Sequence, residues 1–199
     1  IRKAVIEIND EQRDLNDIAA AIRHCYNGDF CQRVIYSESH DEVANGHRRV
    51  TSEVLPQDPQ SHLARKRATL AACVVFSSPG IPMLFQGQEF LETGWFQDNV
   101  PLDWDLSEEF SGIVRLYRDL IKLRLNRAGN TRGLTGQNVF IHHLDHDKKV
   151  IAYLRRHSQG VGDDVLVVAN FSNLCVSGYR IGFPAEGMWR ARFHSDWKR

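Results

Sequence analysis

The spacing of apolar residues divides the chain into a first part with helical periods and a second part with alternating ones. Residues 1–8 fit a strand or a helix equally well, and the first clear helical face begins after Asp10. Its apolar residues recur three and four positions apart, as on one side of an α-helix. They are Leu15, Ile18, Ala19, Ile22 and Tyr26. Asn27 and Gly28 supply the stop, because such residues tolerate the left-handed backbone that ends many helices.

Two short apolar runs flank a second predicted helix. Residues 33–36 are mainly β-branched and aromatic, and residues 81–85 are nearly all apolar, as in a strand covered on both faces. Between them, residues 47–57 read as a loop, and the Asp-Pro pair that opens residues 58–78 is typical of a helix start. Strand, helix and strand in this order predict one βαβ crossover with parallel strands.

The pattern changes from helical to alternating near Gly129. A third helix is predicted over residues 107–128, with Glu108 and Glu109 in its first turn, where the helix dipole favours acids. Beyond it, alternation predicts five short strands separated by turns, including hairpin loops at 145–148 and 159–163. The predicted strands are residues 139–144, 150–155, 165–170, 176–183 and 188–193. The second part is therefore predicted to be all-β.

Composition and charge remove several functional classes. The 199 residues allow one or two domains, and 25 basic residues balance 25 acidic ones. A zero formal charge argues against a nucleic-acid binder, and no apolar run reaches the length of a membrane span. The four cysteines form no Cys-x-x-Cys pair, so we expect reduced, structural thiols and a cytoplasmic protein. No signal peptide is visible, although the N-terminus reads like the interior of a longer chain.

The strongest chemical signal follows the first apolar run. Residues 33–43 read RVIYSESHDEV, so a short strand opens into Ser39, His40, Asp41 and Glu42. In parallel α/β proteins the C-terminal ends of strands carry the catalytic residues. Four polar side chains in a row have no use inside a plain core strand. We therefore predict a functional site at this strand end.

These residues resemble a known family. SESHDEVANG, from residue 37, resembles the fourth signature motif of the α-amylase superfamily of glycoside hydrolases, and its Ser-His-Asp-Glu spelling is most like that of 1,4-α-glucan (glycogen) branching enzymes. PGIPMLFQGQEF, residues 79–90, resembles the last barrel strand of the family, and PLDW, residues 101–104, also resembles branching enzymes. VVANFSN and the final FHSDWKR resemble the sandwich domain that follows the barrel.

The resemblance implies an α/β part followed by an all-β part. Residues 1–128 would be the C-terminal portion of a catalytic (β/α)8 TIM barrel, its last two strands and helices. Residues 129–199 would be an antiparallel β-sandwich domain, itself truncated. Two strands cannot close a barrel, so we expect a C-terminal fragment whose partner is the missing upstream part of the barrel. Open strand edges and apolar helix faces predict self-association of the isolated fragment.

The resemblance also implies roles for the residues of the strand end. Retaining glycosidases need a nucleophile and an acid/base, which this superfamily supplies from earlier strands that are absent from this sequence. We therefore expect the isolated fragment to be inactive. Asp41 matches the transition-state stabiliser, which holds two hydroxyls of the sugar being cleaved. His40 matches the histidine that binds the same sugar, and Glu42 is assigned a supporting role. The alternative is a capped strand end with an incidental ion pair.

Other candidate residues lie in and around the long loop of residues 86–106. Gln88 and Glu89 match the rim of the site in the family, where sugar contact and a structural role are both open. Trp95 and Trp104 have aromatic faces that suit stacking on glucose rings, as does Phe96, or they anchor the loop to its own scaffold. Asp98 and Asp103, in the same loop, bind sugar or cap turns, and the sequence does not decide between these roles.

The function that the resemblance implies is part of a branching enzyme, which cleaves α-1,4 links and forms α-1,6 links in an α-glucan. The alternatives are a hydrolysing relative, such as an α-amylase or trehalohydrolase, and a non-catalytic glucan-binding or assembly module. No cofactor or metal is expected. Ser39, His40 and Asp41 are not a hydrolase triad, because consecutive residues of an extended chain point to opposite faces. A metal site is likewise not expected from His142 and His143, which would lie on opposite faces of a strand.

Overall fold

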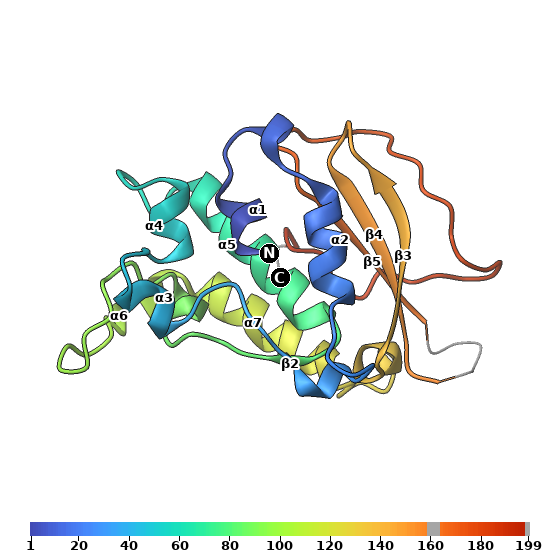
Figure 1. Ribbon diagram of the computed structural model, residues 1–199, viewed down its shortest axis with the longest axis horizontal. Coiled ribbons are helices and arrows are strands. Elements are labelled where there is room, and N and C mark those ends of the chain that lie inside the picture. Colours follow the sequence, from blue (N-terminus) through green and yellow to red (C-terminus); the bar gives the residue numbers. More distant parts are fainter. Residues whose placement is uncertain (159–163, 198–199) are drawn as a thin grey trace.

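A computed structural model describes residues 1–158 and 164–197, in which helices pack against one face of an antiparallel sheet (Figure 1). The longer helices and the strands of the first part are α2 (Leu15–Arg23), α5 (His62–Ser77), α7 (Ser111–Arg124), β1 (Val34–Ile35) and β2 (Ile81–Pro82). Shorter helices are α1 (Arg2–Ile6), α3 (His40–Ala44), α4 (Val50–Val54) and α6 (Asp105–Glu109), with 3-10 turns η1 (Asp10–Gln12), η2 (Phe30–Gln32) and η3 (Gln88–Phe90). The turn η4 (Arg132–Thr135) then leads into β3 (Asn138–Asp145), β4 (Val150–Arg156) and β5 (Val165–Asn170).

The predicted βαβ crossover is present. Strand β1 pairs parallel with β2 in the register Val34↔Ile81 and Ile35↔Pro82. The connection runs through α3, α4 and α5. Among the described residues no third strand joins this pair, so each strand keeps an unpaired edge. Val34 and Ile81 are 49% and 50% exposed and leave the open face of the pair apolar.

Helix α5 lies at the centre of the molecule because small and β-branched residues cover two of its faces. One face carries Ala64, Ala68, Ala71 and Val74, which join a core with α1, α2, α4 and the antiparallel sheet. The other face carries Ala72, Val75 and Phe76, which pack with Ile35 of β1 and with α7. Small side chains let neighbouring elements approach closely, so this one helix supports both the parallel pair and the sheet.

Three arginines from different elements bind the C-terminal end of α5. Arg155 of β4 donates to the carbonyl of Ser77, and Arg124 of α7 donates to those of Ser78 and Gly80. Arg33, just before β1, donates to the Pro79 carbonyl at 2.7 Å. The last carbonyls of a helix have no partner within it and carry partial negative charge, so guanidinium groups stabilise those of Ser77 and Ser78, while the carbonyls of Pro79 and Gly80 belong to the turn that follows. Burial lowers the pKa of each of the three arginines.

The strands β3, β4 and β5 form an antiparallel sheet in that order, and its three strands match three of the predicted ones. Ile151 and Tyr153 of the central strand are fully buried against the helices. The Tyr153 hydroxyl is hydrogen-bonded to the Ser77 hydroxyl of α5. The helical part and the sheet therefore share one core, and the domain boundary at residues 128/129 stays a prediction.

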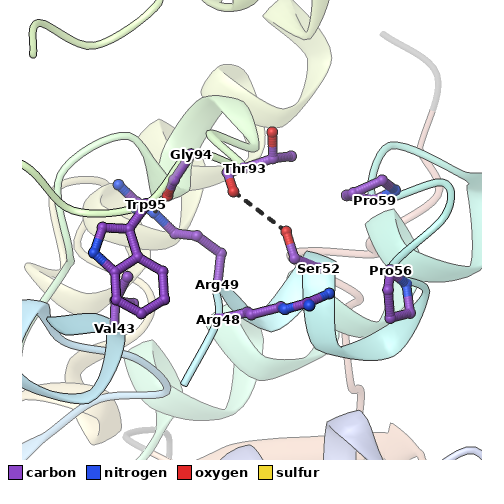
Figure 2. Close-up of a pocket in the computed structure, with 9 residues that line it drawn as sticks. All are labelled: Val43, Arg48, Arg49, Ser52, Pro56, Pro59, Thr93, Gly94 and Trp95. Carbon is purple, nitrogen blue, oxygen red and sulfur yellow. Dashed lines mark hydrogen bonds between the residues drawn. The ribbon is translucent and has the colours of Figure 1, made fainter. Parts of the chain in front are cut away.

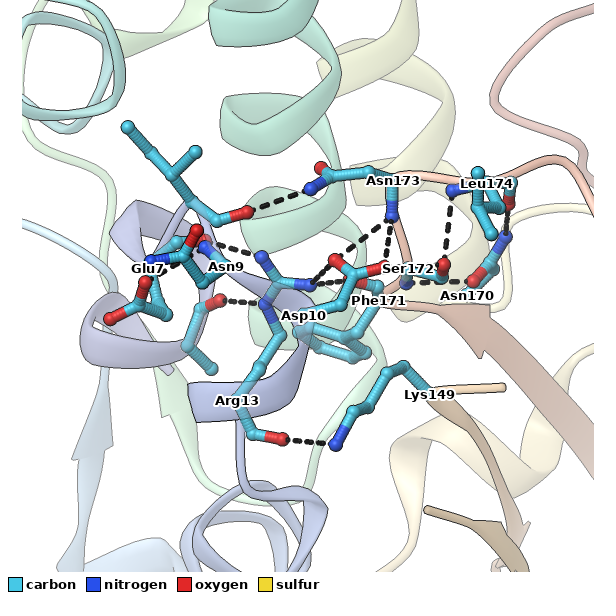
Figure 3. A network of polar contacts seen from close by, with 12 residues as sticks. Glu7, Asn9, Asp10, Arg13, Lys149, Asn170, Phe171, Ser172, Asn173 and Leu174 are labelled. Atoms are coloured by element: carbon cyan, nitrogen blue, oxygen red, sulfur yellow. Dashed lines mark hydrogen bonds and ion pairs between the residues drawn. The ribbon is translucent and has the colours of Figure 1, made fainter. Parts of the chain in front are cut away.

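A polar network joins the start of the chain to the end of β5 (Figure 3). Arg13, fully buried, donates to the carbonyls of Ala4, at 2.8 Å, and Phe171. Its guanidinium also pairs with Asp10 at 2.6 Å, and Asp10 accepts from the Ser172 hydroxyl at 2.7 Å. Burial alone would raise the pKa of Asp10, but hydrogen bonds from Ser172, the Asn173 N–H and Arg13, with the charge of Arg13, outweigh it and lower the pKa. A charged carboxylate is thereby kept between two distant segments.

Several predicted element limits are wrong. Residues 176–183 and 188–193 form no strand, so the described residues of the second part form a single antiparallel sheet of three strands. Gly178 and Gly182 interrupt the first stretch, and Pro184 and Gly187 lie between the two. These residues instead run beside the sheet without regular secondary structure (Figure 1). The Tyr179 ring packs against the His143 ring, and the Gly182 carbonyl lies 2.7 Å from the His142 imidazole. The predicted loop at 159–163 lies outside the described residues.

The helices of the first part also differ from the predicted ones. Helix α5 starts at His62, because the Ser61 hydroxyl accepts from the Ala64 N–H at 3.2 Å and caps the helix three residues after the predicted start. Residues 47–57, predicted as loop, contain α4. The helix predicted over residues 107–128 is split at Phe110 into α6 and α7. None of the described helices combines the length and apolar character needed to cross a membrane.

Arg155→Ala is expected to lower the free energy of unfolding by about 3 kcal/mol, because buried carbonyls at Ser77, Leu134 and Gly136 would lose their donor. The neighbouring Arg156→Ala is a matched control. Arg156 is partly exposed and pairs with Asp164 at 2.7 Å, so its loss should cost less than about 1 kcal/mol. Urea denaturation followed by circular dichroism measures both, and equal effects would contradict the prediction.

The isolated chain is expected to self-associate through the open parallel pair, because unpaired strand edges and exposed apolar residues favour association. Multi-angle light scattering should report a mass above that of one chain, rising with concentration. Val34→Lys with Ile81→Lys should shift the mass towards one chain. A monodisperse monomer across the accessible concentrations would contradict this expectation.

Candidate functional site

The polar residues after β1 form a buried segment followed by a short helix. Ser37, Glu38 and Ser39 are buried, and α3 then begins at His40. The Ser39 hydroxyl accepts from the Glu42 N–H at 3.3 Å and caps this helix. The sequence suggested an extended turn here, but the N-cap places the charged residues in a helical first turn at the C-terminal end of β1.

His40 and Asp41 are neighbours on the outer side of α3. The His40 Nε2 lies 3.2 Å from the Asp41 Oδ1, and the two side chains are 59% and 78% exposed. The His40 ring also packs against Phe96 of the long loop, with ring centroids 5.7 Å apart. Both side chains are accessible to a ligand arriving at this strand end. The role of Asp41 as stabiliser stays a prediction.

Glu42 points towards the start of the chain. Its carboxylate lies 3.7 Å from Arg2, whose other terminal nitrogen pairs with Glu53 at 2.8 Å. Arg2 therefore links α3 and α4 to α1. The contact is compatible with the supporting role predicted for Glu42, because it ties the helix that carries Asp41 to α1 through Arg2.

Gln88 and Glu89 differ in environment. Gln88 is buried, and its amide donates to the Ser37 hydroxyl at 2.7 Å while its oxygen accepts from the Phe85 N–H at 3.3 Å. Gln88 thus joins the chain after β1 to the chain after β2. Glu89 is half-buried, and one of its carboxylate oxygens is buried without a partner in the described part of the chain. Of the two readings open for Gln88, the contacts favour the structural one.

The aromatic residues of the loop divide into anchors and exposed rings. Phe96 packs against Phe85, with centroids 5.8 Å apart. Trp104 lies against Phe90 at 5.2 Å but remains 63% exposed, and Trp95 is 52% exposed. Phe96 therefore anchors the loop, whereas the two indoles keep faces open to a ligand.

Glu92 fixes the loop between these aromatic residues. Its carboxylate accepts from the N–H groups of Thr93 and Gly94, both at 2.9 Å, and of Asp103 at 3.0 Å. Burial alone would raise the pKa of Glu92, but these backbone hydrogen bonds outweigh it and lower the pKa. Gly87 allows the close turn, because its φ is +83° and a Cβ would lie 2.6 Å from the Glu92 side chain.

The sequence did not reveal the buried ion pair between Glu38 and Arg49. Glu38 is 3% exposed, accepts from the Val50 N–H at 2.6 Å and lies 3.7 Å from Arg49. Burial raises the pKa of Glu38 and lowers that of Arg49. Arg49 also donates to the Gln86 carbonyl at 2.8 Å and lies over the Phe85 ring at 3.9 Å. The pair thus holds the loop after β2 to the end of β1.

A cavity of about 290 Å³ opens beside α3 and α4 (Figure 2). It is lined by Val43, Arg48, Arg49, Ser52, Pro56, Pro59, Thr93, Gly94 and Trp95. Of the predicted site residues only Trp95 belongs to this lining. Neither His40 nor Asp41 lines the cavity, so the exposed pair and the cavity are separate features of one region.

Metal ligation and disulfides play no visible part. Within residues 1–158 and 164–197 no group of three or more histidine, cysteine or acidic side chains is arranged to hold a metal ion. All four cysteines are free, and Cys31 and Cys175 are exposed rather than packed in the core.

Comparison with known families and proteins agrees with the sequence motifs. The model of the α-amylase C-terminal all-β domain matches residues 140–199. A 1,4-alpha-glucan branching enzyme GlgB from Burkholderia vietnamiensis is 32% identical over 179 residues, covering 84% of this chain and 23% of that protein. Another from Rhodopseudomonas palustris is 34% identical over 187 residues, with the same coverage of both chains. The chain thus spans about a quarter of the length of these relatives.

Solved structures share the fold. A type I pullulanase from Bacillus subtilis str. 168, complexed with maltose, aligns with a TM-score of 0.58 at 23% identity, covering 79% of this chain and 24% of that one. A pullulanase from Anoxybacillus sp. LM18-11, complexed with maltotetraose, aligns with a TM-score of 0.60 at 20% identity, covering 86% and 27%.

Arg49→Ala is expected to lower the free energy of unfolding by about 3 kcal/mol near neutral pH, because it leaves Glu38 buried without its cation. The pKa of Glu38 is raised in the folded protein, so the folded state binds its proton more tightly than the unfolded state. Stability from this group is therefore greatest below the ordinary glutamate pKa and falls as pH rises through the raised value. The loss in Arg49→Ala should shrink on acidification.

Urea denaturation at several pH values tests this expectation. Arg48→Ala is the matched control, since the exposed Arg48 side chain has no hydrogen bond or ion pair with the described residues and its removal should change stability by less than about 0.5 kcal/mol. A pH-independent loss in Arg49→Ala would show that the charge of Glu38 is not the cause.

Proposed function

This chain belongs to the α-amylase superfamily of glycoside hydrolases, and on that premise we propose that it forms part of a 1,4-α-glucan branching enzyme. The observation that carries the proposal is the Ser-His-Asp-Glu run at the C-terminal end of β1 in a chain whose relatives carry that name at 32–34% identity. Because the chain spans 23% of those relatives, the activity is proposed for a longer protein of which this chain is the C-terminal portion.

The α/β part fits the end of a barrel. Parallel β1 and β2, the crossover helix α5 and the following helix α7 correspond to two successive βα units. The unpaired edges of β1 and β2 would be covered by the preceding strands of a closed barrel. In this proposal residues 1–128 complete the catalytic domain, and the all-β domain follows.

Asp41 is proposed as the stabiliser of the transition state. A retaining glycosidase passes through an oxocarbenium-like state, and hydrogen bonds to the sugar 2-hydroxyl strengthen there and lower the barrier by several kcal/mol. The Asp41 carboxylate accepts hydrogen bonds from sugar hydroxyls, and His40, 3.2 Å away, donates to the same sugar. The exposure of both side chains supports this role, because a sugar can reach them.

The bond changes follow a double displacement. A nucleophilic carboxylate from the earlier barrel strands bonds to C1, and the C1–O4 bond breaks as the acid/base protonates O4. The 6-hydroxyl of an acceptor glucan then attacks C1, its proton passes to the same base, and the carboxylate leaves. This chain supplies neither reacting carboxylate; its residues hold the sugar and the neighbouring loop.

The proposed substrate is an α-glucan. Trp95 and Trp104 present exposed faces at the loop after β2, and aromatic faces match the apolar face of glucose. The pullulanases that share this fold are described as complexes with maltose and maltotetraose, which supports an oligoglucoside ligand.

A hydrolysing relative is the second candidate, because the similar solved structures are pullulanases. In that case water replaces the acceptor hydroxyl in the second step. Product analysis of the complete enzyme on amylose separates the two candidates. New α-1,6 links support the branching assignment, whereas shorter linear chains alone would replace it with hydrolysis.

Asp41→Asn in the complete enzyme is expected to lower the branching rate at least about a thousandfold, since about 4 kcal/mol of transition-state stabilisation is lost. The fold should survive, because the Asp41 side chain is exposed and His40 is its only side-chain partner in the described part of the chain. Asp147→Asn, at an exposed aspartate between β3 and β4, is the control and should leave the rate unchanged. Rates near those of the unaltered enzyme would exclude Asp41 from the reaction.

A further inference from the structure

The cavity in Figure 2 is separate from the proposed catalytic pair. Its volume of about 290 Å³ lies at the small end of ligand pockets, which suits a ligand of about one ring. Val43 of α3 forms part of its wall, while Asp41 of the same helix faces outwards. A ligand here would touch the helix that carries Asp41 without occupying the site of cleavage.

The polar side chains of the lining are all hydrogen-bond donors or hydroxyls. Arg48 and Arg49 bring guanidinium groups, and Ser52 and Thr93 bring hydroxyls; no carboxylate or amide side chain lines the cavity. The Ser52 hydroxyl donates to the Thr93 carbonyl at 3.3 Å, so its oxygen remains free to accept. Such a lining favours a ligand rich in acceptors and carrying negative charge, because guanidinium–phosphate hydrogen bonds are strong.

The two arginines play different parts. The Arg49 guanidinium is held in place by Glu38 and the Gln86 carbonyl, so it is a fixed part of the cavity lining. The Arg48 guanidinium has no hydrogen bond or ion pair with any residue that the structure describes. Its backbone is nevertheless fixed, since its N–H donates to Glu53 at 3.0 Å and its carbonyl accepts from Arg2 at 2.5 Å. The Arg48 side chain is exposed, so its guanidinium is solvated in the free protein and available to an anionic ligand in the cavity.

The acids near the cavity have other partners. The Glu53 carboxylate is already engaged by Arg2 at 2.8 Å and lies 3.4 Å from His47. The Glu92 carboxylate accepts hydrogen bonds from three backbone N–H groups. The positive charge at Arg48 is therefore free to act on a ligand.

The remaining wall is apolar. Trp95 presents an indole that is 52% exposed, and Pro56, Pro59 and Val43 complete the surface. Figure 2 shows the Trp95 ring and the Arg48 guanidinium on different sides of the cavity. An aromatic face matches the apolar face of a pyranose, so the cavity combines a sugar-binding wall with an anion-binding group.

We propose that this cavity binds a phosphorylated monosaccharide unit, with the phosphate on Arg48 and the sugar ring against Trp95. The unit has two sources with the same chemistry: a free sugar phosphate, or a phosphate ester carried by a glucan chain. This assignment goes beyond the proposed function and shares only Trp95 with the proposed glucan-binding loop; neither His40 nor Asp41 takes part, so the catalytic proposal can fail without it.

Isothermal titration of the 199-residue chain with glucose 6-phosphate tests the proposal. Saturable one-site binding is expected, and Arg48→Ala and Trp95→Ala should each weaken it about tenfold or more, the loss expected for a charged hydrogen-bonding group. Arg118→Ala and Trp189→Ala remove the same residue types elsewhere and should leave affinity unchanged. Circular dichroism checks that each variant is folded, and Arg48→Gln replaces Arg48→Ala if that variant does not fold.

Further titrations define the ligand. Glucose and inorganic phosphate should each bind at least about tenfold more weakly than glucose 6-phosphate, since each lacks one half of the recognised group. Maltotriose bearing a 6-phosphate identifies the source: tighter binding than the free sugar phosphate indicates the glucan-borne ester, and weaker binding indicates the free ester.

Three results would overturn the proposal. They are no saturable binding of either phosphorylated sugar to the folded chain, binding unaffected by Arg48→Ala, and inorganic phosphate binding as tightly as the sugar phosphate. The branching assay on the complete enzyme is independent of these titrations, so failure of either proposal leaves the other in place.

Discussion

The structure depends on the way the C-terminal end of α5 is held. A helix end inside a protein exposes carbonyls that need donors, and here Arg33, Arg124 and Arg155 supply them. The donors come from the start of β1, the end of α7 and the middle of the antiparallel sheet. One helix terminus therefore sets the relative positions of the parallel pair and the sheet, without any acid to neutralise the three cations there among the described residues.

The candidate site inherits its geometry from this arrangement. Helix α5 supports β1 and β2 from behind, and Gln88 and the Glu38–Arg49 pair join their C-terminal ends in front. The loop after β2 is then tied down by Glu92 and Phe96. Asp41, His40 and the indoles of Trp95 and Trp104 remain largely exposed at this end, even though His40 and Trp104 also pack against Phe96 and Phe90.

The sequence predicted those features that local patterns encode. Apolar runs located β1 and β2, alternation located β3 to β5, and the polar run after β1 located His40 and Asp41. Patterns do not encode long-range partners, so the Glu38–Arg49 pair was missed: its arginine lies in a segment that reads as loop. The start of α5 was misplaced because Asp58 and Ser61 are both good caps, and only tertiary packing selects the second. The strands predicted at residues 176–183 and 188–193 did not form, because an alternating pattern does not show whether a neighbouring strand is there to pair with.

The network of Figure 3 limits how far the all-β part can be treated as a module. The carbonyl of Phe171, just after β5, accepts hydrogen bonds from both Arg13 and Arg67, and Lys149 reaches back to the Arg13 carbonyl at 3.0 Å. Grafting a β domain from another relative onto this scaffold would thus sever contacts made by the opening thirteen residues. Recombination between relatives would have to exchange both segments together.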